Sequence, residues 1–494
     1  MSGFHAFHKV VEPKEPSNKF SKKLYKSIFF DLNGGKEVYA KLIENEDENV
    51  VQISIVSNLM YNLDCRFFAF QEKDVVESYR PYFCEFFVDK TISINQSLMK
   101  TLGTNVGKWI KVQLFKENKD SINSRFIEGT LVFSASPVIR TRCRLVYNKN
   151  FMAQNEQYVE LNNKMNNKDG LLLDIIHRGV GEGNKYIIEE FRDLTSNVNS
   201  IKGIVYNVGQ GNCISLEMNG ENGLCTMFFD VGEALTPSKE SDELYYIDVT
   251  NNSISSIEPN FVILSHWDAD HILGAHALAD CAFWLTNDNG HQTFWITPDL
   301  NLLNKRQISV SAARLCAYLV QIGIIYMCNQ LGERINNSCN DFAELFQGKG
   351  DNTKNKRTNN IGLILKIKIQ SMIDKNPTEQ LLLLTGDCEY SQMHNEVLGE
   401  NKYDLIVTPH HGSKNAVLVD SKDEIGYCCV NASSHGRAII SYGKNKHGHP
   451  EAAHIAALKR SGFTYYMTPG CERIDFSAST TNRLEIKTIK GEIL

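Results

Sequence analysis

The sequence predicts an α/β protein whose N-terminal part is mostly β, and two observations carry this prediction. In the C-terminal part, three short apolar runs each end in a carboxylate or an imidazole: residues 261–264, 381–385 and 405–408. Such runs indicate buried strands whose carboxyl ends share one rim of a sheet, where open α/β sheets usually place their sites. The first 150 residues instead alternate or cluster β-branched and aromatic residues between turn residues, which is typical of a β domain.

The segment Ser265-His266-Trp267-Asp268-Ala269-Asp270-His271 is the strongest functional signal in the chain. It places two imidazoles and two carboxylates within six positions, at the end of the first apolar run. These ligand types together suit zinc or manganese, and a solvated polar loop would seldom carry this alternation at a strand end. We therefore expect a metal site at this rim.

Two further ligand-bearing turns follow in the sequence. Gly386-Asp387 ends the second apolar run, and Pro409-His410-His411-Gly412-Ser413-Lys414 ends the third. Taken alone, Gly386-Asp387 is an ordinary turn dipeptide. In this order after residues 265–271, the turns predict that Asp387 and the adjacent histidines belong to the same site.

These motifs resemble the metallo-β-lactamase superfamily and, within it, the hydrolase domain of DNA-uptake competence proteins of the ComEC type. The resemblance covers about residue 200 to the C-terminus and implies an αββα sandwich there. In residues 265–271, Asp268 stands where the superfamily usually has a second His. The other matching segments are Asn207 to Asn212, Phe229-Asp230-Val231-Gly232, Asn359-Asn360, Gly386-Asp387, His410 to Lys414, Ser441 to Asn445 and Gly448-His449-Pro450.

The chain departs from the family pattern at two places. Asn207 and Asn212 replace carboxylates that are usual in the first motif, although the glycines of that turn remain. No His between residue 271 and Asp387 matches the third ligand-bearing motif, because we interpret His276 and His291 as satisfied or solvated side chains. One metal position is therefore expected to be short of ligands or to be completed by water.

The resemblance implies two divalent metal ions, zinc or manganese. His266 and Asp268 would hold one ion, Asp270 and His271 would hold the other with His410 or His411, and Asp387 would bridge them. His410 directly follows the proline that ends its strand, so it is our first choice as the ligand, with His411 behind it; the sequence leaves this choice open. Water between two cations becomes acidic enough to act as the nucleophile, so Asp268 and Asp270 are candidate catalytic residues.

A second group of side chains is expected to contact a substrate phosphate. Residues 452–458 predict a helix after Pro450, and a helix N-terminus favours an anion. Lys414 and His449 are the candidate catalytic residues for orienting the phosphate and protonating the leaving group. The whole expected group is Ser413, Lys414, Lys444, Asn445 and His449.

The loop over residues 348–360 is polar and carries four cations, Lys349, Lys354, Lys356 and Arg357. It leads into the strand expected to pair with the one that ends before Asp387. The sequence leaves open whether this loop is merely solvated or grips phosphate.

Length and composition indicate a soluble protein of two or three domains. The chain has 494 residues, of which 42% are hydrophobic and 22% charged, and no run approaches the roughly 20 apolar residues of a membrane span. The start lacks a signal pattern, and thirteen cysteines without a Cys-x-x-Cys pair indicate reduced thiols, so a cytoplasmic location is expected. A net charge of -6 offers nucleic acid no general attraction, so any such binding needs a local basic patch.

We divide the chain into a mostly β domain of unknown function over residues 1–150, a connector over 151–199 and a metallo-β-lactamase-like hydrolase domain over 200–494. The first segment is expected to form a sandwich or barrel with strands near residues 51–55, 66–70, 86–88, 109–112 and 129–133. Its aromatic residues are interpreted as core, not as a base-stacking surface. The connector is expected to contain a helix around residues 186–194.

The expected function is a metal-dependent phosphodiester hydrolase, a nuclease acting on DNA, as the resemblance implies. Soluble stand-alone proteins of this type often accompany bacterial defence genes, so the expected context is antiviral defence. One alternative is a hydrolase of a small ester or small phosphodiester. Another is an inactive scaffold whose β domain binds a protein partner, although clustered carboxylates are costly without a metal. The expected partners are thus nucleic acid and a protein bound by the N-terminal domain, with no membrane.

Overall fold

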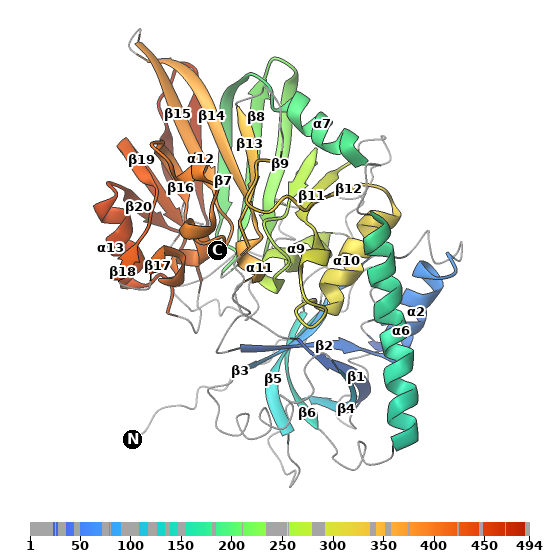
Figure 1. Ribbon diagram of the computed structural model, residues 1–494. Helices are drawn as coiled ribbons and strands as arrows, with labels where there is room; N and C mark the ends of the chain where they lie inside the picture. Colours follow the sequence, from blue (N-terminus) through green and yellow to red (C-terminus); the bar gives the residue numbers. More distant parts are fainter. Residues whose placement is uncertain are drawn as a thin grey trace, which may run out of the picture.

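The computed structural model describes residues 23–24, 26–27, 36–43, 50–71, 79, 81–89, 108–116, 126–133, 139–146, 155–179, 184–209, 211–233, 254, 256–278, 292–335, 342–350, 357–373, 376–421, 424–443, 448–469 and 471–489 (Figure 1). The chain is a mixed α/β protein with several sheets, as the sequence predicts. Within the ranges given, every helix is too short or too polar to cross a lipid bilayer.

The N-terminal strands close into a barrel in the order β1-β2-β3-β5-β6-β4, in which all neighbours are antiparallel. Alternate residues such as Cys143 and Leu145 are buried, whereas Arg144 between them is partly exposed, which is the periodicity of a filled barrel. The strands are β1 (Lys36–Leu42), β2 (Val50–Val56), β3 (Cys84–Asp89), β4 (Trp109–Lys116), β5 (Phe126–Phe133) and β6 (Ile139–Val146).

The strand expected near residues 66–70 is wrong, because residues up to 68 belong to helix α2 (Asn58–Phe68). Ser57 caps this helix, since its hydroxyl accepts a hydrogen bond from the Met60 N–H at 3.3 Å. Met60, Leu63 and Phe67 are all buried, and their spacing follows the helical period. Phe67 and Phe68 therefore pack from a helix, whereas Phe70 lies beyond its end and is exposed, and a short window of sequence does not separate this pattern from a strand.

Two helices join the barrel to the rest of the chain. The expected helix near residues 186–194 corresponds to α7 (Lys185–Leu194), but the preceding segment also forms a 25-residue helix, α6 (Asn155–Gly179). Helix α6 packs against α10 (Val310–Gln321), α2 and β4, so this segment is a structural element between barrel and sheets.

Two large sheets form the C-terminal part. One has the order β12-β11-β10-β9-β8-β7-β21-β22, and the other has the order β13-β14-β15-β16-β19-β20. The first contains β7 (Val198–Tyr206), β8 (Cys213–Gly220), β9 (Gly223–Val231), β10 (Phe261–Ile263), β11 (Phe294–Pro298), β12 (Ile325–Cys328), β21 (Arg473–Ser479) and β22 (Glu485–Ile489). The second contains β13 (Ala343–Gln347), β14 (Leu363–Ile373), β15 (Asn376–Leu384), β16 (Lys402–Val407), β19 (Asn431–Ile440) and β20 (Thr464–Met467).

The sheets pack face to face with helices outside, which gives four layers in the order α, β, β, α. Phe229 and Ile263 of one sheet share a buried core with Leu384 of the other. The outer face of the eight-stranded sheet packs on α9 (Ala269–Leu278) and α10, and that of the six-stranded sheet packs on α13 (Ala452–Arg460). Shorter elements are α11 (Arg357–Asn360), α12 (Asn395–Leu398), η4 (Leu300–Leu302), η5 (Tyr390–Gln392), η6 (Pro409–Gly412), η7 (Asn415–Val417), β17 (Leu418–Ser421) and β18 (Glu424–Tyr427).

The middle strands of each sheet run parallel. Strand β10 lies between β9 and β11, and β16 lies between β15 and β19, in each case with parallel neighbours. Carboxyl ends of parallel neighbours meet at one edge, so the turns after β15 and β16 come together in the six-stranded sheet. The Leu363 N–H donates to the Ser265 carbonyl at 2.8 Å, which ties the edges of the two sheets to each other.

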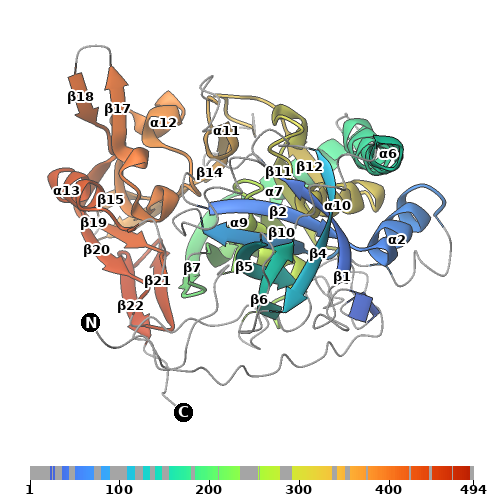
Figure 2. The same cartoon turned by 90° about the horizontal axis from the view of Figure 1, so that it is seen from below.

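The barrel contacts the sandwich through buried charges. Asp64 of α2 binds Arg314 of α10, with 3.1 Å between Oδ2 and Nη2, and Lys168 of α6, with 2.7 Å between Oδ2 and Nζ. Burial alone would raise the pKa of Asp64, but the two cations outweigh it and lower the pKa to about 2. The barrel accordingly lies beside α9 and α10 in both views (Figure 1, Figure 2).

Candidate metal centre

The segment 265–271 leaves the sheet after β10 and enters α9. Leu264 still donates to the Ile296 carbonyl of the neighbouring strand, so the chain stays in the sheet up to the first ligand. The Asp268 carbonyl accepts hydrogen bonds from the N–H groups of His271 and Ile272, which starts the helix. As a result, His266 and Asp268 lie in the turn, whereas Asp270 and His271 lie in the first turn of α9.

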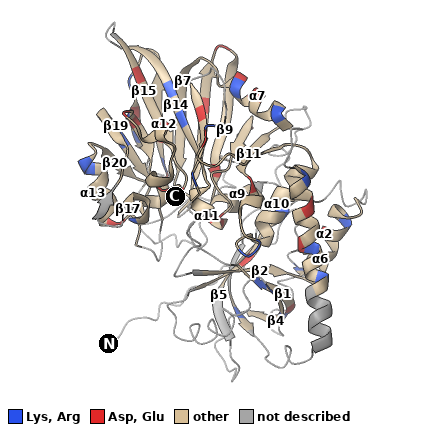
Figure 3. Cartoon of the chain, in the orientation of Figure 1, with Lys and Arg blue, Asp and Glu red and all other residues tan. Residues whose placement is uncertain are grey.

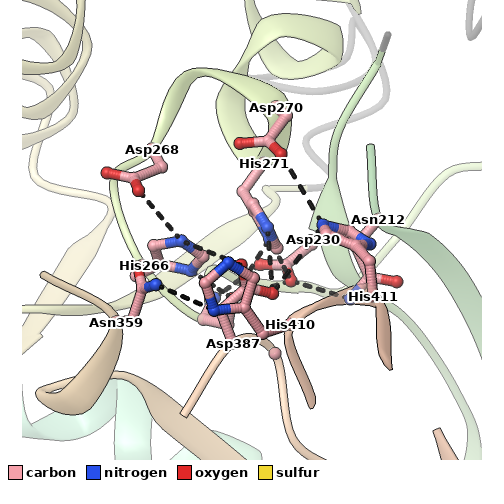
Figure 4. Close-up of polar contacts among 12 residues, drawn as sticks. Asn212, Asp230, His266, Asp268, Asp270, His271, Asn359, Asp387, His410 and His411 are labelled. Atoms are coloured by element: carbon pink, nitrogen blue, oxygen red, sulfur yellow. Dashed lines mark hydrogen bonds and ion pairs between the residues drawn. The ribbon is translucent and has the colours of Figure 1, made fainter. Parts of the chain in front are cut away.

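Asp387 reaches the same edge through a glycine turn after β15. Gly386 has a φ of 52°, and a Cβ there would lie 2.3 Å from the Ser265 Cβ, so only glycine fits this approach. The turn after β16 brings His410 and His411, whose φ angles are 49° and 52°. Figure 4 shows their side chains around Asp387 with those from the segment 265–271.

Asp387 is the centre of the cluster. Its Oδ1 lies 3.4 Å from His271 Nε2 and 3.8 Å from His411 Nε2. Its Oδ2 lies 3.9 Å from both His266 Nε2 and His410 Nε2. Two sets of three ligand atoms lie close enough to share an ion: His266, His271 and Asp387, and Asp270, His271 and His411.

The imidazoles are oriented as metal ligands are. In each of three histidines, Nδ1 has a partner: Ser265 Oγ at 3.0 Å for His266, Asp230 Oδ2 at 2.8 Å for His271 and the Ser441 carbonyl at 2.8 Å for His411. Their Nε2 atoms are buried and make no hydrogen bond to the described residues. A buried nitrogen without a hydrogen bond is costly, and a divalent cation would satisfy all three. The residues present therefore fit zinc or manganese.

Charge coupling shifts the pKa values of the cluster. Burial opposes ionisation of Asp270, but His271 and His411 lower its pKa to about 2, and the histidines also hold the pKa of Asp387 well below its usual range. Burial would lower the pKa of His271, yet Asp387, Asp230 and Asp270 raise it well above its usual value. The carboxylates are thus ionised at neutral pH, and binding of a cation would displace protons from imidazoles.

Several residues that orient this cluster were not among the predicted site residues. Asp230 was noted only as part of a turn motif, but it is fully buried and accepts hydrogen bonds from Ser265 Oγ and from the Ser265 N–H at 2.6 Å. Asn212 donates to the same carboxylate at 3.1 Å. The sequence signal was the matching turn motif itself, whereas the roles of Ser265, Asn359 and Ser441 become visible only in space.

The predicted phosphate-binding residues are not all at the cluster. His449 lies beside His410, with 5.6 Å between ring centroids. The Lys414 side chain is 55% exposed, and its Nζ lies 3.9 Å from Oε2 of Glu451, a residue that the sequence did not single out. Ser413 is buried and accepts from the Asn415 N–H, which argues against direct contact with substrate. Lys444 and Asn445 lie outside the described residues.

The remaining sequence candidates lie away from the ligand sets or cannot be placed. Lys349 donates to Asn395 Oδ1 at 3.3 Å on the surface. Lys354, Lys356, His291 and the Arg357 side chain lie outside the described residues. His276 is buried in α9 against Phe83, which directly precedes β3 of the barrel, with ring centroids 5.6 Å apart. Of the two interpretations drawn from the sequence, burial excludes a solvated ring, and His276 packs as a core histidine away from the ligand sets.

Comparisons with known proteins leave the family of this chain undefined. No family model matches, and no curated protein matches. Among solved structures, the chain is similar to the long form RNase Z from yeast, at 10% sequence identity and a TM-score of 0.30. The match covers 57% of this chain and 41% of that chain, so this protein spans well under half of its length. The class of site consequently has to come from the geometry described above.

Proposed function

We propose that this protein is a metal-dependent phosphodiester hydrolase with a two-ion centre, of the metallo-β-lactamase type that its motifs resemble. The observation that carries the proposal is the convergence of three buried, unbonded Nε2 atoms on Asp387, beside two ligand sets that share His271. A scaffold protein would have no reason to bury ionised carboxylates among three imidazoles whose Nε2 atoms lack hydrogen bonds.

His266, Asp268, Asp270, His271, Asp387 and His411 would hold the cations, with Asp387 between them. When bound, divalent cations lower the pKa of water and offset negative charge on a phosphate. The first turn of α9 fixes two of these ligands, and Asp230, Ser265 and Ser441 fix the ring orientation of the imidazoles. Rigid placement keeps the reacting groups near one geometry, which is the main contribution a protein makes to such a site.

His449 and Lys414 are the proposed residues on the substrate side. His449 Nδ1 lies 3.7 Å from Glu451 Oε1, and we assign to this ring the donation of a proton to a leaving oxygen. Lys414 is exposed and linked to the same glutamate, so its ammonium can turn towards a phosphate. The start of α13, where the sequence predicts an anion site, thus already holds the Glu451 carboxylate beside His449 and Lys414. A substrate phosphate would have to displace this carboxylate from the two side chains.

The substrate that we propose is nucleic acid, with DNA favoured by the resemblance to competence proteins, and antiviral defence as the context. Figure 3 shows Lys and Arg interspersed with Asp and Glu along the described elements, so attraction of a polyanion would depend on local cations near the centre. The proposed protein partner of the barrel stays a prediction.

The test compares hydrolysis of single-stranded DNA, duplex DNA, RNA and a small chromogenic phosphodiester by the zinc- and manganese-loaded protein. We expect Asp387→Ala to abolish hydrolysis of every substrate and to reduce the metal content, while thermal unfolding stays cooperative. Nucleic acid affinity should fall with salt, by a slope of about -0.7 to -0.9 per phosphate contact. Activity on the small diester alone, without salt-dependent binding of any nucleic acid, would move the assignment to a small-substrate hydrolase. A chain that binds no metal would refute the proposal.

A further inference from the structure

The adjacent histidines His410 and His411 lie on opposite sides of Asp387. We propose that they serve different metal ions. His410 then completes the ligand set of the metal position for which the sequence shows too few ligands. This inference rests on the proposed two-ion centre and assigns the side chains that hold each ion. It changes the sequence-based expectation, in which one of the two histidines binds and the other lies behind it.

The two oxygens of Asp387 divide the histidines into pairs. Oδ1 faces His271 and His411, at 3.4 and 3.8 Å from their Nε2 atoms. Oδ2 faces His266 and His410, at 3.9 Å from each Nε2 atom. His271 also lies close enough to His266 and Asp387 to share an ion with them. We assign it to the ion at Oδ1, because that is the oxygen that its Nε2 faces at 3.4 Å. A carboxylate that bridges two ions presents one oxygen to each, so each pair of imidazoles then belongs to the ion on its own side.

The other carboxylates follow the same division. Asp270 Oδ2 lies 3.6 Å from His411 Nε2, whereas Asp268 Oδ2 lies 3.6 Å from His266 Nε2. Each side therefore has two imidazoles, one aspartate and one oxygen of Asp387, which is the number of ligands that zinc usually takes. The Oδ2 set is His266, Asp268, His410 and Asp387, and the Oδ1 set is Asp270, His271, His411 and Asp387.

The backbone of the turn separates the two rings. His410 and His411 both adopt the left-handed conformation, which is rare for two successive residues with side chains and costs roughly 1–2 kcal/mol for each. Their ring centroids are 6.4 Å apart and their planes meet at 85°. The turn is held by a hydrogen bond from the His410 N–H to the Gly386 carbonyl at 3.1 Å, in the turn that carries Asp387. Backbone strain that persists at a site indicates that function requires this placement of the two rings.

Asn359 supplies the contact that a metal-bound His410 needs. Its amide nitrogen lies 3.3 Å from His410 Nδ1, and its Oδ1 is buried without a hydrogen bond to any residue described here. Rotation of the amide by half a turn would let Oδ1 accept the proton of Nδ1 and would leave the Nε2 lone pair for a cation. His266, His271 and His411 already have such a partner on Nδ1.

The experiment measures bound zinc per chain by equilibrium dialysis and elemental analysis. We expect about two ions in the wild type, and about one in His410→Ala and in His411→Ala. His435→Ala, which removes an exposed histidine paired with Arg483, is the matched control and should keep two. The double variants are decisive: His266→Ala with His410→Ala should retain about one ion, whereas His266→Ala with His411→Ala should retain almost none.

A second readout separates ligation from a structural effect. His410→Cys loaded with cobalt should show a new thiolate-to-cobalt charge-transfer absorption, which His435→Cys should lack. A wild type with two ions in which His410→Ala also keeps two would overturn this inference and leave the proposed function intact. Two other results would also overturn this inference alone. One is a reversed pattern, in which the double variant with His410→Ala loses both ions and the one with His411→Ala keeps one. The other is a wild type with a single ion that His411→Ala removes and His410→Ala does not. A wild type without metal would overturn both proposals.

Discussion

Asp230 shows how much of the candidate centre depends on one carboxylate. It is fully buried at a φ of 59°, and its Oδ1 accepts from the Ser265 N–H. Its Oδ2 accepts from Ser265 Oγ and from Asn212 and lies 2.8 Å from His271 Nδ1. This carboxylate thus orients the imidazole that faces Asp387 Oδ1 and fixes the turn that carries His266. It acts through these residues and is a positioning residue.

At this scale we predict that Asp230→Asn weakens metal binding by about 10- to 100-fold, because an amide lacks the charge that holds the proton on His271 Nδ1. Competition titration with a coloured chelator measures the affinity of each ion. The affinity should fall most for the ion that is lost in His411→Ala, since His271 belongs to the same ligand set. Glu379→Gln, at an exposed carboxylate, is the control. Affinities within twofold of the wild type would show that Asp230 does not orient the ligand.

Helix α9 is held at the centre by a close approach of its first turn to two glycine turns. A Cβ on Gly232 would lie 1.9 Å from the Asp270 carbonyl oxygen, and one on Gly211 would lie 2.8 Å from the same atom. Any side chain at these positions must therefore push the ligand-bearing end of the helix away from Asp387. Gly211 of segment 207–212 and Gly232 of segment 229–232 therefore have a steric role. This role does not depend on the carboxylates that Asn207 and Asn212 replace.

We accordingly predict that Gly232→Ala lowers the free energy of unfolding by roughly 1–3 kcal/mol and removes at least one bound ion. Urea denaturation and elemental analysis measure the two effects. Gly170→Ala in α6 is the matched control, because no atom lies within 4 Å of its added Cβ. That variant should gain roughly 0.5–1 kcal/mol through helix propensity. Equal behaviour of the two variants would contradict a steric role for Gly232.

Over the whole molecule, the barrel and the sandwich meet at a buried interface that contains ionisable groups. Besides Asp64 and its two cations, the interface buries His276 of α9 against Phe83, the residue that directly precedes β3. Burial first, and then the charge of Arg314, lower the pKa of His276 to about 3. The folded protein therefore keeps this ring neutral at a pH where the unfolded chain has protonated it.

The sign of the pH effect follows from that depressed pKa. The unfolded chain binds a proton near pH 6.5 and the folded protein only near pH 3, so stability is present above pH 6.5 and is lost as the pH falls between these values. Between pH 7 and pH 4.5 the loss from this group is roughly 3 kcal/mol. We predict that the free energy of unfolding of His276→Leu, measured by urea denaturation, falls by this amount less between the two pH values than that of the wild type. His435→Gln, at an exposed histidine, should lose as much as the wild type. Parallel pH dependences for the wild type and His276→Leu would contradict the prediction.

The sequence by itself determined the α/β class, the strands that carry the ligands and the composition of the cluster. Short apolar runs specify buried strands through local periodicity, and the segment 265–271 needs no distant residue to present two imidazoles and two carboxylates at a strand end. The turns at Asp387 and His411 were predicted for the same reason, because each follows its own apolar run.

The tertiary structure decided what depends on distances between remote segments. Residues 66–68 form a helix because Met60, Leu63 and Phe67 find a core on one side, which a local pattern of aromatic residues does not reveal. Asp230 contacts His271 across 41 positions, and His411 binds the Ser441 carbonyl across 30. The choice between His410 and His411 depends on two left-handed backbone angles and on the direction of each Asp387 oxygen. Packing of the two sheets fixes those directions, and no pattern along the chain encodes them.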